Sequence, residues 1–123
     1  MRVFSIAAGV ALALVGLTQS GLAQAKPTTL KGHVMDVSCA TKDVSKGAAA
    51  IADHDKKCLL MDPCVKSGYA LVTADLKVLK FDAKGNQLAL DLIKKTEREK
   101  DWTVAVNGVV SGDTIAVTSI QMQ

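Results

Sequence analysis

Four side chains that can carry chemistry lie within 26 residues of one another: Cys39, His54, Cys58 and Cys64. Thiolate sulfur and imidazole nitrogen are the ligands that zinc and copper prefer, and two thiols can also join in a disulfide. The chain contains three cysteines, and an odd number in an exported protein leaves one thiol without a disulfide partner. The set therefore predicts one site, built on a disulfide or on a metal ion, with thiol redox chemistry or an intermolecular disulfide as the third alternative.

Export is indicated by residues 1–25. They begin with Met1-Arg2, continue through an apolar run over 3–17 and end in Ala23-Gln24-Ala25. This order is typical of a Sec-type signal peptide, here with cleavage expected after Ala25, and the run is short for a membrane span of about 20 residues. We expect a periplasmic or secreted protein with no membrane contact after cleavage.

The remaining chain, residues 26–123, has the length of one small domain with one core. Without Arg2 it carries 14 basic and 12 acidic residues, a net charge of +2, and its aromatic residues are Tyr69, Phe81 and Trp102. A nucleic-acid-binding protein would show a basic stripe and stacking aromatics. Nucleic acid is therefore not an expected partner.

The first half of this domain predicts a strand, a helix and a hairpin. Residues 28–36 have a strand pattern, with Gly32 as a bend or bulge. The alanine-rich stretch favours a helix over 46–59 that Pro63 stops. Two short strands, 69–73 and 77–81, follow as a hairpin.

The second half predicts a helix and another hairpin. Residues 82–86 form a turn, and Asn86 is the expected N-cap of a short amphipathic helix that ends at about 95. Apolar and polar residues alternate from Trp102 to Asn107 and again from 115 to 120, the pattern of two half-buried strands joined by a turn at 111–113.

This order predicts a mainly β fold with two short helices. Five strands with a helix between the third and fourth is the order of an OB-like barrel, β-α-β-β-α-β-β with a helical insertion between strands 1 and 2. An antiparallel sheet packed on two helices without closure is the alternative. In either case the insertion carries all four chemically distinctive residues.

The first interpretation of the insertion is a disulfide that clips it to the barrel. Cys39, Cys58 and Cys64 allow three pairings, of which Cys39 with Cys58 or with Cys64 would tie the loop to the sheet. Closing a loop of roughly 20 residues contributes about 3 kcal/mol in the chain-entropy model.

The alternative is a zinc or copper site. Four residues apart on one helix, His54 and Cys58 would share a face, where Cys39 and Cys64 could complete a Cys3His set. The Cys-x5-Cys spacing is looser than the Cys-x2-Cys of zinc ribbons.

No catalytic arrangement is present in the sequence, so we expect no enzyme. It lacks a Ser-His-Asp order, a phosphate loop and the Cys-x-x-Cys of thioredoxin-like enzymes. His33, Tyr69 and Trp102 are candidates for a ligand face, and Asp36 either accepts backbone hydrogen bonds in the loop or is a turn residue. The expected partner is a small ligand or another exported protein, bound by a monomer with no cofactor unless the metal alternative holds.

Several motifs of the chain resemble a family of short exported bacterial proteins of uncharacterised function. The most specific motif is His-x3-Cys-x-Leu-Met-x-x-Cys, which covers residues 54–64. The other matching segments are residues 32–39, Lys-Phe-Asp at 80–82, Gly-Asn at 85–86 and residues 112–115. The resemblance covers nearly all of residues 26–123 and implies a secreted, OB-like barrel with a cysteine-bearing insertion. It implies no activity. Many of those sequences have an aromatic residue where this chain has His33.

Overall fold

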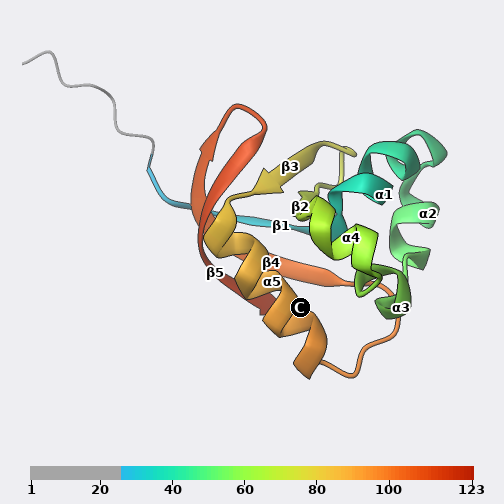
Figure 1. The fold of residues 1–123 in the computed structure, drawn as a ribbon. Helices are drawn as coiled ribbons and strands as arrows, with labels where there is room; N and C mark the ends of the chain where they lie inside the picture. Colours follow the sequence, from blue (N-terminus) through green and yellow to red (C-terminus); the bar gives the residue numbers. More distant parts are fainter. Residues whose placement is uncertain (1–25) are drawn as a thin grey trace, which may run out of the picture.

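The computed structural model describes residues 26–123, and the predicted signal peptide lies outside the described residues. A cluster of short helices follows the first strand, and one longer helix lies between two pairs of consecutive strands (Figure 1). The elements are β1 (Thr28–Asp36), α1 (Val37–Asp43), the 3-10 turn η1 (Val44–Lys46), α2 (Ala48–Asp53), α3 (Lys56–Leu59), α4 (Asp62–Ser67), β2 (Tyr69–Val72), β3 (Val78–Phe81), α5 (Ala83–Lys95), β4 (Thr103–Ser111) and β5 (Thr114–Met122).

The five strands form one mixed sheet that closes on itself. Its order is β1-β2-β3-β5-β4, and β1 also pairs with β4. All neighbouring strands are antiparallel except β3 and β5, which run parallel and pair only through Lys80 with Thr114 and Phe81 with Ile115. A long β4–β5 hairpin, with a register shift at Asn107/Gly108, forms one wall.

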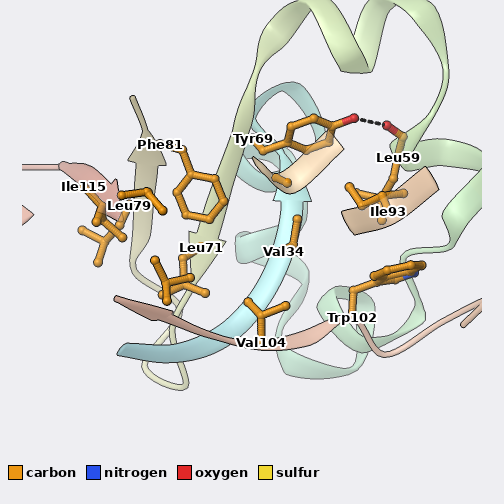
Figure 2. Close-up of a cluster of buried hydrophobic side chains, with 13 residues drawn as sticks. Val34, Leu59, Tyr69, Leu71, Leu79, Phe81, Ile93, Trp102, Val104 and Ile115 are labelled. Carbon is orange, nitrogen blue, oxygen red and sulfur yellow. Dashed lines mark hydrogen bonds between the residues drawn. The ribbon is translucent and has the colours of Figure 1, made fainter. Parts of the chain in front are cut away.

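The main core fills the inside of this sheet and extends under α5. Alternate residues of β4 and β5 point inward, as the period-two pattern predicts. Figure 2 shows Val104, Ile115, Phe81 and Leu71 packed in this core, with Trp102 and Ile93 at its other end. The expected strand assignments over 28–36 and through the C-terminal hairpin are confirmed.

A second, smaller cluster joins the insertion to the outer face of the sheet. Met35 of β1 and Val72 of β2 point away from the main core and are covered by Ala40 of α1 and Ile51 of α2. Leu76, in the β2–β3 turn, packs on the same cluster with a positive φ of 64°. In Figure 1 the helices α1 to α4 gather on one side of the molecule. The insertion is thus held by its own apolar contacts.

The prediction of two helices is wrong, because the insertion is not one helix. Residues 26–123 contain five α-helices and one 3-10 turn. The expected helix over 46–59 is interrupted at Gly47, whose φ is 97°, and again at His54 and Asp55, which are extended. Pro63 does not stop a helix but lies in the first turn of α4, where its missing N–H costs nothing.

The predicted N-cap of the last long helix is also wrong. The α5 helix begins at Ala83, and the Asp82 side chain accepts a hydrogen bond of 2.9 Å from the Gly85 amide. Asn86 lies within the helix instead, and its Oδ1 accepts a 2.8 Å hydrogen bond from the Tyr69 amide. Asp and Asn are comparable N-caps, so sequence alone does not decide between these two residues.

Candidate functional site

The insertion is organised around the carboxylate of Asp36, which is fully buried. Asp36 is the last residue of β1 and the N-cap of α1. Its Oδ2 accepts hydrogen bonds from the Ser38 hydroxyl at 2.7 Å and from the Cys39 amide at 3.0 Å. Its Oδ1 lies 2.8 Å from Nε2 of His54, the C-cap residue that follows α2. One carboxylate therefore joins the end of β1, the start of α1 and the end of α2.

This carboxylate is ionised in the folded protein. Burial raises the pKa of Asp36, but the hydrogen bonds from His54, Ser38 and the Cys39 amide outweigh it and hold the pKa well below its ordinary value. Because an ionised carboxylate only accepts hydrogen bonds, the proton of this contact lies on His54 Nε2. The imidazole is thereby fixed in position, with Nε2 as the donor.

Two thiols lie against the same carboxylate. Cys39 comes from α1 and Cys64 from α4, and their sulfur atoms and an Asp36 oxygen all lie within 4.8 Å of one another. The Ser67 hydroxyl reinforces this junction of α1 and α4, since it accepts from the Ser38 amide at 3.3 Å and donates to the Cys64 carbonyl at 2.7 Å. We call Asp36, Cys39 and Cys64 the thiol–carboxylate cluster.

Both thiols of the cluster are poor nucleophiles in their reduced form. Burial and the neighbouring Asp36 charge raise the pKa of Cys39 to about 12, and the same two causes raise the pKa of Cys64. Redox catalysts instead depend on a thiol whose pKa is lowered. The raised pKa values are consistent with a structural bond or with a metal ion that displaces the protons.

Cys58 lies apart from this cluster. It belongs to α3, and its amide donates a 2.8 Å hydrogen bond to Asp55, the N-cap of that helix. The interaction of the Cys58 thiol with the Asp55 side chain, followed by burial, raises the pKa of that thiol. With His54 it lines a hollow of about 310 Å³ on the surface of the insertion.

The structure therefore does not bring the four residues of the predicted Cys3His set together at one point. Cys39 and Cys64 meet at Asp36, whereas His54 contacts Oδ1 of that carboxylate without belonging to the cluster, and Cys58 lines the hollow on the surface of the insertion. The prediction placed His54 and Cys58 on one helical face, but the chain is extended at His54, so the i, i+4 relationship does not apply.

The three candidates for a ligand face do not share one surface either. His33 is half-buried, with its Nε2 2.6 Å from Asp101, and it lines two hollows of about 400 and 230 Å³. Tyr69 and Trp102 are 1% and 2% exposed and belong to the core, so they do not lie on a surface face. Figure 2 shows the Tyr69 hydroxyl, which donates a 2.7 Å hydrogen bond to the Leu59 carbonyl and so ties α3 to the core.

The larger hollow lies over the pairing of β1 with β4. It is lined mainly by apolar atoms, and its lining includes Lys31, His33, Thr103 and Ala74. The smaller hollow shares His33 and Ala74 with it and continues towards Ile51 of α2. The two hollows therefore adjoin at His33 and Ala74, and the smaller one reaches the insertion.

The sequence offered Asp36 either as an acceptor of backbone hydrogen bonds or as a turn residue. The hydrogen bond from the Cys39 amide confirms the first alternative, but the contacts of Asp36 with His54 and the two thiols were not predicted. The signal that could have found its place at the start of α1 is the spacing Asp36-x-x-Cys39 at the end of a strand, which is an N-cap pattern. The contact of Asp36 with His54 spans 18 residues and has no local sequence signal.

No helix in residues 26–123 is long and apolar enough to cross a membrane.

Comparison of the chain with protein-family models, with curated proteins and with solved structures found no match.

Proposed function

We propose that this protein is an exported, monomeric, OB-like module that binds a small ligand beside a helical insertion clipped by a Cys39–Cys64 disulfide. The strand order β1-β2-β3-β5-β4, closed through β1 and β4 with β3 parallel to β5, supports the OB-like assignment. The signal-peptide pattern over residues 1–25 supports export to a periplasm or to the outside of the cell.

The observation that carries the binding proposal is the hollow of about 400 Å³ over β1 and β4. Its volume falls within the range of small-molecule sites. Its walls are mainly apolar and include Lys31, while Nε2 of His33 is engaged by Asp101. A positive group beside apolar walls favours an amphipathic anion. The adjoining smaller hollow brings the insertion to its edge, so the placement of the insertion shapes the site.

The clip is supported by the position of the two sulfurs. Cys39 and Cys64 lie at the beginning and the end of the helical insertion, and their sulfur atoms lie within 4.8 Å of each other. An oxidising compartment favours a disulfide between such neighbours. Cys58 then remains as the single free thiol, which accounts for the odd number of cysteines.

Peptide mapping of the protein recovered from its exported location tests the clip. Digestion under acidic, non-reducing conditions is expected to release one disulfide-linked peptide pair that contains Cys39 and Cys64, with Cys58 in a free peptide. A Cys58–Cys64 link, or three free thiols, would contradict it.

Binding of the fluorescent amphipathic anion 8-anilinonaphthalene-1-sulfonate tests the hollow. We expect the folded protein to enhance its fluorescence and Ala74→Phe, which fills the hollow, to weaken binding at least ten-fold. Ala116→Phe is the matched control, because Ala116 is an exposed residue of β5 outside the hollow. Equal binding by the Ala74→Phe variant would reject this site.

A further inference from the structure

The thiol–carboxylate cluster has the ligand types and the spacing of a metal site. Its three donor atoms come from the end of β1, from α1 and from α4, and lie within 4.8 Å of one another. In a tetrahedral zinc site with Zn–S near 2.3 Å and Zn–O near 2.1 Å, neighbouring ligand atoms lie about 3.5–3.8 Å apart. Small side-chain movements would therefore bring the three atoms to bonding distance of one ion.

We propose that, when its thiols are reduced, the cluster binds one zinc-class divalent cation through Asp36, Cys39 and Cys64. This ligand set differs from a Cys3His set, because Asp36 takes part and neither His54 nor Cys58 does. The inference goes beyond the binding module proposed above. A Cys39–Cys64 disulfide and this metal site use the same sulfurs and exclude each other.

The type of donor selects the ion. Two thiolates and one carboxylate favour zinc, cobalt or cadmium over magnesium and calcium, which prefer oxygen ligands alone. With both thiols deprotonated the cluster would hold three negative charges, and binding of a divalent cation would reduce the net charge of the site to −1. Ion binding therefore releases two protons from Cys39 and Cys64 and removes most of the repulsion among the three groups.

The surroundings of Asp36 match those of a metal-binding carboxylate. Three of its four lone-pair directions are used by Ser38, the Cys39 amide and His54, so one remains for an ion. Hydrogen bonds of this kind fix a ligating carboxylate in position. His54 is thus a positioning residue, because its hydrogen bond to Oδ1 fixes the orientation of the Asp36 carboxylate.

Access to the site is from the side of Cys39. Cys39 is partly exposed, whereas Asp36 and Cys64 are buried. An ion can therefore enter beside Cys39, and a water molecule or a ligand from solution can complete the fourth position, as in open zinc sites.

Titration of the metal-free protein with Co²⁺, after reduction by a phosphine, tests the proposal. We expect a 1:1 complex with sulfur-to-cobalt charge-transfer absorption in the near ultraviolet. Cys39→Ser and Cys64→Ser should each weaken Co²⁺ binding at least ten-fold and lower this absorption. The matched control is Cys58→Ser, which should leave both the spectrum and the affinity unchanged.

A second measurement needs no variant and so does not depend on whether the serine variants fold. One equivalent of Zn²⁺ should protect Cys39 and Cys64, but not Cys58, from alkylation in the reduced protein. His54→Ala should weaken metal binding roughly 10- to 100-fold, and His54→Gln, which keeps an N–H donor, should restore most of it without changing the spectrum.

Two results would overturn the inference. One is the absence of charge-transfer absorption at stoichiometric Co²⁺. The other is an equal loss in Cys58→Ser, with protection of Cys58, because this would assign the ion to a different ligand set. Peptide mapping of the exported protein shows independently whether Cys39 and Cys64 form a disulfide. The disulfide proposal and the metal-site proposal can therefore fail separately.

Discussion

The Nε2 atom of His54 lies 2.8 Å from Oδ1 of Asp36, and both side chains are almost completely buried. The pair joins the end of the first strand to the end of the second insertion helix, across 18 residues. A buried charged group of this kind is stable only while its partners are in place. The arrangement of the insertion therefore depends on one ionised carboxylate.

Acid should destabilise the protein through Asp36. Its pKa is held well below the unfolded value of about 3.9 by His54, Ser38 and the Cys39 amide, against the opposing effect of burial. A carboxyl group with a lowered folded-state pKa contributes stability that is fully present above about pH 4 and is lost as the pH falls further. Urea unfolding between pH 7 and pH 2.5 should show this loss.

The comparison variant is Asp36→Asn, which keeps the shape and removes the charge. We expect it to cost about 3 kcal/mol at pH 7 and to flatten the dependence of stability on pH below 4. A variant that is as acid-sensitive as the wild-type protein would show that other carboxyl groups are responsible.

The rate at which iodoacetamide alkylates Cys39 should differ between the folded and the unfolded protein. Because burial and the Asp36 charge raise the pKa of Cys39 to about 12, its thiolate fraction at pH 8 is several orders of magnitude below that of a free cysteine. In the reduced protein, iodoacetamide should modify Cys39 at least 100-fold more slowly than it does in concentrated urea. Mass spectrometry of timed digests gives both rates, and similar rates would contradict the proposed environment.

Reduction of the proposed clip should lower stability. The segment between Cys39 and Cys64 is roughly 25 residues long, and the chain-entropy model gives about 3.5 kcal/mol for a loop of this length. The measurement is urea unfolding of Cys58→Ser with and without reductant, since this variant permits only the Cys39–Cys64 bond. An unchanged midpoint would mean that no such bond stabilises the fold.

Gly85 should not tolerate alanine, although it lies in a helix. A Cβ there would meet Cγ2 of Val117 at 2.5 Å and Cβ of Phe81 at 2.8 Å. Alanine gains about 1 kcal/mol in helix propensity, but overpacking at this contact of α5 with β5 should cost more, for a net loss of about 1–2 kcal/mol. Lys84→Ala, exposed in the same turn, is the control and should change the thermal midpoint little. A stabilised Gly85→Ala variant would contradict the close packing.

The sheet was predictable because its signals are local. Val104 and Val106 alternate with polar or small neighbours, and Ser111-Gly112-Asp113 marks the turn, so the C-terminal hairpin follows from the sequence alone. The first strand ends at Asp36 as expected. A period of two residues is set by the strand itself and needs no knowledge of distant partners.

The insertion was predicted poorly because distant contacts determine it. Helix propensity favours a continuous helix through the alanines, but the chain stays extended at His54, where the side chain reaches Asp36. Likewise, Tyr69 was a candidate for a ligand face, but it is buried and its hydroxyl donates a hydrogen bond to the Leu59 carbonyl. Such contacts between distant segments outweigh a weak local preference.

The two residue pairs that join β3 to β5 have a consequence for how the protein is made. This short parallel contact closes the sheet, and Asp82 secures it: its Oδ1 accepts from the Gly85 amide at 2.9 Å and from the Val117 amide at 3.2 Å. Of the five strands in residues 26–123, β5 is the last to be synthesised. Until it arrives, β3 presents an unpaired edge that could recruit other chains, and the nascent polypeptide passes through a stage prone to aggregation.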